Sequence, residues 1–309
     1  MKIAMMGSGG VGGFFGGRLA HAGYDVSFIA RGSHFAAMRE RGLTIENAPQ
    51  GDIHVPKVRV TDDPETLGVV DLVILSVKLW DTETAAEQIL PLVGPNTGVL
   101  SLQNGVIKDD ILRRRLGDGA VMGGVGYVAT TISRPGVIHQ TGTLQRVVLG
   151  EYDGRKSKRA AFLHEALVHA GVNAELSSDV RRAIWEKYVF LVGLSATTTA
   201  MRKPLGPIRE NPQTRAFLLD IMRETVAVGR AHGVALPENY AGGRLAFADG
   251  LPADMTSSMH HDLERGNRLE VEWLSGGVVQ LGQSAGVPTP ANRAVCDILA
   301  LHAAGGKPS

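Results

Sequence analysis

The stretch KIAMMGSGGVGGFFGGRLAHAGYDVSFIAR, from Lys2 to Arg31, determines how the first half of the chain folds. A short apolar run ends in the glycine-rich segment GSGGVG (residues 7–12), which is followed by a helix-compatible segment and then by a second apolar run over residues 26–30. This order predicts a strand, a glycine turn, a helix and a second strand. In that context a G-x-G-x-x-G sequence indicates a dinucleotide-binding site, whereas an isolated match is as often a flexible turn.

Each glycine of the turn has its own expected role. Gly7 permits a tight turn, Gly9 lets the backbone approach a pyrophosphate, and Gly12 lets the helix pack closely on the strand. Backbone N–H groups at the start of the helix then face the anion. The predicted cofactor-binding residues of this turn are Gly7, Ser8, Gly9, Gly10, Val11 and Gly12.

The end of the second strand indicates which dinucleotide binds. NAD sites carry an acidic residue there for the ribose 2′-hydroxyl, whereas NADP sites carry an arginine nearby. Here Arg31 ends the strand, Ser33 and His34 follow, and no acid is present. A guanidinium holds a phosphate through charge-assisted, bidentate hydrogen bonds, so the sequence predicts NADP(H) as cofactor. The alternative is a solvated surface arginine.

Length and composition place the chain among ordinary globular proteins with two domains. It has 309 residues, of which 44% are hydrophobic and 20% charged, and a net charge of +1 that gives no general attraction to nucleic acid or acidic membranes. Its single cysteine, Cys296, excludes an internal disulfide and fits a cytoplasmic location. No export signal is visible, and the longest apolar stretch (residues 188–201) is too short to span a bilayer.

The segment up to residue 178 is predicted to be a Rossmann-type, doubly wound α/β domain. Lys78 follows a near-continuous apolar run (DLVILSVK), and Asn104 follows another (GVLSLQ), as expected for buried parallel strands. Ligands of such sheets bind beyond the carboxyl ends of the strands, so we expect Gly7, Arg31, Lys78 and Asn104 along one edge. Each of the last two is equally consistent with an ordinary surface or turn residue. The predicted helices are 33–41, 81–90 and 157–170, and the further strands are 43–46, 53–60, antiparallel strands within 120–152, and 173–176.

From residue 179 onward the apolar pattern becomes helical. Asp179 and Asn211 are expected to cap helices, because their side-chain oxygens accept hydrogen bonds from the first free backbone N–H groups. The predicted helices are 179–199, 212–232, 255–285 and 290–303. The sequence therefore predicts two domains, a Rossmann domain over 1–178 and a helical domain over 179–309.

Lys187 lies in an otherwise apolar helical segment between Trp185 and Tyr188. A partly desolvated lysine has a lowered pKa and is able to release a proton near neutral pH. A lysine that extends its ammonium from the helix edge into water fits the same pattern. His260 and His261 are adjacent and point to different sides of a helix, so we predict no metal site.

Six motifs together resemble the ketopantoate reductase family over nearly the whole chain. They are GSGGVG, Arg31, LSVK at Lys78, SLQNGV around Asn104, IWEKYVF around Lys187, and SSMHHDLERGNRLEVEWLSG around Glu270. The resemblance implies a Rossmann domain followed by a helical domain, with the active site in the cleft between them. It also implies NADPH-dependent reduction of the 2-oxo acid 2-dehydropantoate (ketopantoate) to (R)-pantoate in pantothenate biosynthesis, and a homodimer.

The resemblance also implies roles for individual residues. Lys187 would be the general acid, and Glu270 its partner near the cofactor and the reacting carbonyl. Asn104 would contact nicotinamide ribose and substrate. The other contacts that it implies are Ser258 with the substrate, Lys78 with the NADP side of the cofactor, and the backbone of Ala129 with the nicotinamide.

The chain departs from the family at the substrate positions. Family members with established ketopantoate activity tend to carry asparagines four and eight residues after the lysine, on the same helical face, and another further on. Leu191, Ser195 and Leu205 stand there instead. Loss of those amides bears on substrate choice, because polar sites discriminate strongly for their polar partner. The alternatives are therefore a reductase of another, less polar 2-oxo acid and a catalytically silent NADPH-binding sensor.

Overall fold

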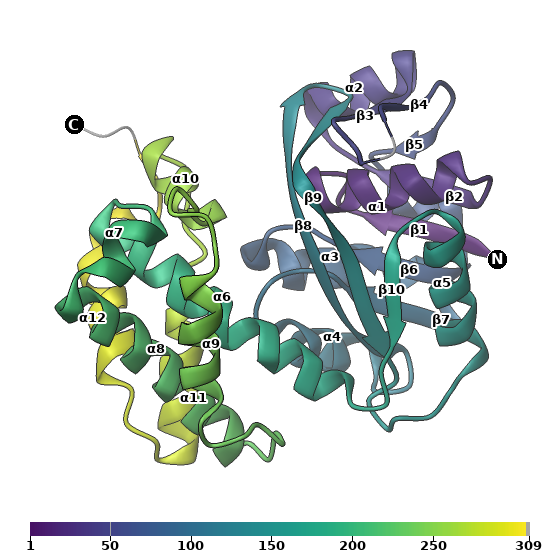
Figure 1. Cartoon of the computed structure of the whole chain (residues 1–309). Helices are drawn as coiled ribbons and strands as arrows, with labels where there is room; N and C mark the ends of the chain where they lie inside the picture. The colour runs from purple at the N-terminus through teal and green to yellow at the C-terminus, as the bar shows by residue number, and fades with distance from the viewer. Residues whose placement is uncertain (50, 307–309) are drawn as a thin grey trace. The chain divides into compact units, whose positions relative to one another are not determined.

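The computed structural model describes residues 1–49 and 51–306, and it confirms the predicted fold class. The opening stretch forms β1 (Lys2–Met6), α1 (Gly10–His21) and β2 (Asp25–Ile29), with β1 and β2 parallel. The chain divides into two compact units (Figure 1). The first comprises residues 1–103 and 108–183, and the second comprises residues 104–107 together with the chain from Ile184 onward. The division into domains 1–178 and 179–309 remains our proposal.

A mixed sheet forms the centre of the first unit. Within the described residues its strand order is β4-β3-β9-β8-β7-β6-β1-β2-β5, with β10 paired to β9. The pairs of the central path from β8 to β5 are parallel, whereas β8 and β9 form a long antiparallel hairpin and β3 and β4 are also antiparallel. The remaining strands are β3 (Leu43–Glu46), β4 (Ile53–Val55), β5 (Arg59–Thr61), β6 (Val70–Leu75), β7 (Val93–Ser101), β8 (Val121–Arg134), β9 (Val137–Gly150) and β10 (Asn173–Leu176).

Both faces of the central strands are buried, as their continuous apolar runs predict. Met5 packs into the apolar cluster on the side of α1 and α5, whereas its neighbour Met6 packs into the cluster on the side of α3 and α4. Helices therefore cover the sheet on both sides (Figure 1). Besides α1, the helices of this unit are α2 (Gly32–Arg41), α3 (Thr82–Gln88), α4 (Lys108–Leu116) and α5 (Lys158–His169). The 3-10 turns are η1 (Pro64–Leu67), η2 (Leu79–Asp81) and η3 (Leu90–Leu92).

The second unit is built from helices. In it α8 packs against α7, α9, α11 and α12. Two glycines bring α6 close to α8: a Cβ at Gly193 would lie 2.8 Å from Met222, and one at Gly229 would lie 2.8 Å from Trp185. The helices are α6 (Val180–Met201), α7 (Leu205–Glu210), α8 (Pro212–Ala231), α9 (Tyr240–Asp249), α10 (Ser258–Glu264), α11 (Ser275–Ala285) and α12 (Pro290–Leu299), followed by η4 (Ala300–His302).

The predicted caps of two helices are confirmed. The Asp179 carboxylate accepts a hydrogen bond from the backbone N–H of Arg182, and the Asn211 side chain accepts from those of Gln213 and Thr214. The short helices α7 and α9 were not predicted. Among the described residues, none of the helices combines the length and apolar character needed to cross a bilayer.

The single strand predicted over residues 53–60 is wrong. The structure has two short strands instead, and β4 pairs with β3 whereas β5 pairs with β2, at opposite ends of the sheet order. Pro56 lies between them. Because proline has no N–H to donate to a strand ladder, it separates the two apolar runs that the alternating pattern joined.

The long helix predicted over residues 255–285 is also wrong. Gly266 adopts a left-handed φ of +68°, and its N–H donates to the carbonyl of Leu263 at 3.1 Å, which ends α10. An irregular segment follows, anchored by the N–H of Leu269 on the carbonyl of Ala303, before α11 begins at Ser275. Glu270 therefore lies in a non-helical connection. The sequence pattern did not indicate this break, because the helical spacing of apolar residues continues across it.

Candidate active site

The glycine turn has the steric properties that a dinucleotide site requires. Gly7 has a φ of +92°, which side chains rarely adopt. A Cβ at Gly12 would collide with the carbonyl of Gly7 and the hydroxyl of Ser76, whereas one at Gly9 would meet no atom within 4 Å. The turn is thus packed tightly on its inner side and open at Gly9. The Ser8 hydroxyl donates to the carbonyl of Ile29 at 3.0 Å, which ties the turn to the end of β2.

The hairpin strand β8 runs beside the start of α1. A Cβ at Gly10 would lie 2.6 Å from the carbonyl oxygen of Thr130, so only glycine fits there. The preceding residue, Ala129, is exposed and lies where the pairing of β8 with β9 shifts register between Val128 and Thr130. Val11, which follows Gly10 in α1, is half-buried.

Arg31 and Lys78 follow β2 and β6, the two strands that flank β1 in the sheet. Because these strands are parallel, Gly7, Arg31 and Lys78 lie at the same edge. Both long side chains are exposed: Arg31 donates to the Gln88 side chain at 2.8 Å, and the Lys78 ammonium lies 5.6 Å from the centre of the Trp80 ring.

Asn104 and Lys187 lie together in the second unit. The Lys187 ammonium donates a hydrogen bond to the Asn104 side-chain oxygen at 2.9 Å. Lys187 is half-buried on α6 beside the buried Trp185 and Tyr188. The Tyr188 hydroxyl donates to the carbonyl of Leu274 at 2.6 Å, and burial raises the pKa of Tyr188 far above its usual range. Trp185 and Tyr188 thus anchor this part of α6 in the apolar core of the second unit.

The other residues expected at the substrate differ widely in exposure. One and two turns after Lys187 on α6 are Leu191, which is half-buried, and Ser195, which is buried and whose hydroxyl has no hydrogen-bond partner among the described residues. Leu205 is fully buried in the apolar core of the second unit. Ser258 is exposed at the first position of α10, and the Glu270 side chain is buried.

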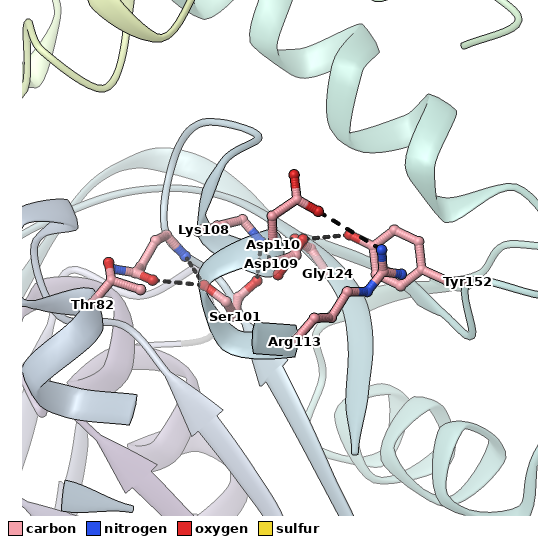
Figure 2. A network of polar contacts seen from close by, with 9 residues as sticks. Thr82, Ser101, Lys108, Asp109, Asp110, Arg113, Gly124 and Tyr152 are labelled. Carbon is pink, nitrogen blue, oxygen red and sulfur yellow. Dashed lines mark hydrogen bonds and ion pairs between the residues drawn. The ribbon is translucent and has the colours of Figure 1, made fainter. Parts of the chain in front are cut away.

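A buried polar network of the first unit was missed by the sequence prediction (Figure 2). The Lys108 ammonium is 1% exposed and donates to the carbonyl of Ser101 at 2.9 Å, to that of Gly124 at 3.2 Å and to the Asp109 carboxylate at 3.1 Å. Burial lowers the pKa of Lys108, and the Asp109 charge opposes that shift. The sequence IKDDIL resembles any solvated helix start, so only tertiary structure discloses the burial.

The network extends from Asp109 to Tyr152. The Tyr152 hydroxyl donates at 2.6 Å to Asp109 Oδ2, one of the two oxygens that accept from Lys108, and the guanidinium of Arg113 lies 3.6 Å from the centre of the Tyr152 ring. Burial and the Asp109 charge raise the pKa of Tyr152 above its usual range, so its hydroxyl stays a donor. Figure 2 shows these groups arranged around the start of α4, directly after the segment that carries Asn104.

His260 of α10 has structural contacts. His260 is buried, its Nδ1 lies 2.8 Å from the carbonyl of Thr198, and its Nε2 lies 3.2 Å from Glu264. Within residues 1–49 and 51–306, no group of three histidine, cysteine or acidic side chains has a geometry that could hold a metal ion.

Two family models match the chain. The one described as ketopantoate reductase PanE/ApbA matches residues 3–154, and the one described as its C-terminal domain matches residues 179–303. The first match includes the glycine turn and the strand ends described above. The second includes Lys187, Ser258 and Glu270.

Individual relatives agree with these matches. A 2-dehydropantoate 2-reductase of Mesorhizobium japonicum is 32% identical, over 96% of this chain and 95% of its own. The crystal structure of a PanE/ApbA family ketopantoate reductase from Ralstonia eutropha is 36% identical with a TM-score of 0.89, covering 98% of each chain. A structure of D-mandelate dehydrogenase with NADH and anilino(oxo)acetate has a TM-score of 0.88 at 23% identity, again over 98% of each chain, and shows a shared fold.

Proposed function

The chain belongs to the ketopantoate reductase family and is thereby an oxidoreductase that acts on CH–OH groups with a nicotinamide cofactor; we propose that it reduces 2-dehydropantoate to (R)-pantoate with NADPH, as a step of pantothenate biosynthesis. The observation that carries this proposal is the hydrogen bond of 2.9 Å between the Lys187 ammonium and the Asn104 amide oxygen. It holds a proton donor in a fixed place on a half-buried helix face.

The residues of the first unit fit a bound dinucleotide. The open position at Gly9 lets a pyrophosphate reach the N-terminus of α1, where free backbone N–H groups favour an anion. Arg31 is our candidate for the 2′-phosphate of NADPH, because its present partner is the neutral side chain of Gln88, which a phosphate would readily replace. The exposed Lys78 and Ala129 complete the proposed cofactor contacts.

In this reaction the bound cofactor supplies a hydride to the carbonyl carbon of the 2-oxo acid. Lys187 donates the proton that converts the carbonyl oxygen into a hydroxyl. The Asn104 oxygen accepts one of the three ammonium N–H groups, which orients the others, and the Asn104 amide N–H₂ remains available as a donor. We assign to Glu270 the orientation of cofactor and substrate, and to Ser258 a contact with the substrate.

A second candidate substrate follows from the face of α6 next to Lys187. Leu191 is apolar and half-buried one turn after Lys187, and two turns after it Ser195 is 1% exposed. Leu205, outside this face at the start of α7, is 0% exposed and also offers no donor. This face offers few donors for a hydroxyl on the substrate. It therefore favours, as the alternative, a 2-oxo acid whose substituent is less polar than that of ketopantoate.

A panel of 2-oxo acids tests the proposal. Purified protein is mixed with NADPH and, in separate reactions, ketopantoate, 2-oxoisovalerate, phenylglyoxylate and pyruvate, and the absorbance of reduced nicotinamide is followed. We expect ketopantoate to have the highest kcat/KM. A higher value for 2-oxoisovalerate or phenylglyoxylate would support the less polar substrate, and NADPH binding by fluorescence without turnover of any acid would overturn the assignment as a reductase.

A further inference from the structure

The segment that carries Asn104 is short and belongs to a different unit from the residues on either side of it. Residues 104–107 are part of the second unit, whereas Gln103 and Lys108 belong to the first. Within the second unit, Val106 packs against the apolar core, and a Cβ at Gly277 would lie 3.2 Å from Ile107. Four residues with both ends held have little freedom, so whatever holds the ends also determines where Asn104 lies.

The second end of this segment is held by Lys108. Its ammonium has three N–H donors, and the structure gives it three partners: the carbonyl of Ser101, the carbonyl of Gly124 and the Asp109 carboxylate. The two carbonyls come from β7 and β8, so one side chain joins the two strands to the start of α4. The Tyr152 hydroxyl donates to Asp109 Oδ2, which also accepts from the Lys108 ammonium.

The first end is held by Gln103. Its side-chain oxygen accepts from the Ser101 hydroxyl at 3.0 Å, and its amide N–H₂ donates to the Thr82 hydroxyl at 2.9 Å and to the carbonyl of Lys78 at 3.3 Å. Ser101 therefore takes part at both ends, through its hydroxyl to Gln103 and through its carbonyl to Lys108. All of these side chains except Lys78 are buried.

A buried ion pair of this kind is a poor source of stability, because the cost of removing both charges from water offsets their attraction. The pair of Lys108 and Asp109 is 1% and 2% exposed. However, the hydrogen bonds from Lys108 to β7 and β8 are directional, so they fix the place of the start of α4 relative to these strands more narrowly than apolar packing would. The pair is therefore better suited to positioning this segment than to stabilising the fold.

We propose that the network of Lys108, Asp109 and Tyr152 positions the Asn104 segment, and that it thereby maintains the hydrogen bond from the Lys187 ammonium to Asn104. Lys108 is in this view a positioning residue that acts through Asn104. The proposal deepens the proposed function, because it concerns the same proton donor. It also has a consequence that does not need turnover.

That consequence concerns the protonation of Lys187. An amide oxygen that accepts a hydrogen bond from an ammonium favours its protonated form. Loosening the network weakens this hydrogen bond, so Lys187 should lose its proton at lower pH. A network that only stabilises the fold would leave the titration of Lys187 unchanged.

Competitive acetylation of Lys187 tests this directly. The rate of its reaction with acetic anhydride, followed by mass spectrometry between pH 7 and pH 11, reports the fraction of unprotonated amine in the resting protein. Tyr152→Phe removes one hydroxyl at the far end of the network without leaving a large cavity. Tyr24→Phe is the matched control, because its hydroxyl contacts His169 at 3.2 Å in the same unit and is not part of the network.

We expect Asn104→Ala and Tyr152→Phe to move the titration midpoint of Lys187 to lower pH, by about 1 and about 0.5 pH units. Tyr24→Phe should leave it in place. In the Asn104→Ala background Tyr152→Phe should add no further shift, because both act through one hydrogen bond. Lys108→Met should act as Tyr152→Phe does, with a larger shift, if the variant folds.

Two outcomes overturn the proposal. In the first, Asn104→Ala shifts the titration midpoint of Lys187 but Tyr152→Phe leaves it at the wild-type value. In the second, Tyr152→Phe shifts the midpoint as much in the Asn104→Ala background as in the wild type. The proposed function fails separately, if no 2-oxo acid is reduced. If it holds, the alkaline limb of the kcat profile should move with the acetylation midpoint, and on that limb, at pH values above the midpoint, kcat of Tyr152→Phe should be about threefold below that of the wild type.

Discussion

The glycine turn of the first unit and the Lys187 face of the second unit differ in which atoms form the site. The turn acts through backbone, and its requirements are steric: a positive φ at Gly7, no room for a Cβ at Gly12, and open space at Gly9. The Lys187 face acts through side chains, and its defining contact joins residues 83 positions apart in the chain. A site formed by backbone can be recognised from the local sequence, because it requires glycine at particular positions. A site formed by side chains from distant positions cannot, because only folding brings those side chains together.

The largest effect is expected in the side-chain region. Lys187→Ala should lower kcat by about 10²- to 10⁴-fold, because a positioned proton donor contributes that range. NADPH affinity should stay within about twofold, since the proposed dinucleotide contacts lie elsewhere. Stopped-flow kinetics and fluorescence titration measure the two quantities. Lys203→Ala, which removes an exposed lysine just after α6, is the control and should change neither.

The next effect concerns the backbone region. Gly12→Ala places a methyl group against the carbonyl of Gly7 and should lower the free energy of unfolding by about 1–3 kcal/mol, with loss of NADPH binding. Gly9→Ala meets no atom within 4 Å, so its stability should be unchanged and only NADPH affinity should fall. Thermal denaturation with and without NADPH separates them. Equal destabilisation by both changes would show that the turn is not packed as described.

The difference between the two regions also explains what the sequence predicted. The strand, turn and helix of the opening stretch were predicted because Gly7 and Gly12 meet local steric needs that no other residue meets. Lys187 was ambiguous by pattern alone, and the role proposed for it came from family resemblance. The burial of Lys108 could not be predicted, because its partners Ser101 and Gly124 come from separate strands.

The breaks in regular structure show the same limit. The end of α10 depends on the left-handed conformation of Gly266, which a continuing helical spacing of apolar residues concealed. The separation of β4 from β5 follows from Pro56, and their places at opposite ends of the sheet depend on tertiary packing. Local composition marks such breaks, but the partner that each segment then finds is a property of the whole fold.

A smaller effect should identify the cofactor contact of Arg31. Arg31→Ala should weaken NADPH binding by about 10- to 100-fold, the range for a lost hydrogen bond to a charged group, and should leave NADH binding nearly unchanged. Calorimetric titration with both cofactors measures this ratio. Equal weakening of NADPH and NADH would mean that the Arg31 side chain does not contact the 2′-phosphate, and the end of β2 would then not select the cofactor.

The smallest effect concerns pH and the first unit. Burial lowers the pKa of His34, against a hydrogen bond with the backbone of Ser8, and its Nδ1 accepts from the N–H of Gly136 at 3.1 Å. The folded state therefore binds this proton less readily than the unfolded state. Neutral His34 therefore stabilises the folded state at pH values above its ordinary pKa of about 6.5, and this contribution to the free energy of unfolding is lost as the pH falls below that value.

Denaturant unfolding at pH 7.5 and pH 5.5 measures that contribution. The free energy of unfolding of the wild type should fall by up to about 1 kcal/mol more than that of His34→Gln, whose side chain does not titrate. A wild type that loses no more stability than His34→Gln would show that His34 is protonated equally in the two states.

The most direct test of the account is the pH dependence of a single turnover in wild type and Lys187→Ala. With saturating NADPH and ketopantoate, we predict that the wild-type rate falls tenfold per pH unit on the alkaline side, as one group loses its proton. The residual rate of Lys187→Ala should lack this limb. An alkaline limb retained unchanged in Lys187→Ala would contradict the claim that Lys187 donates the proton.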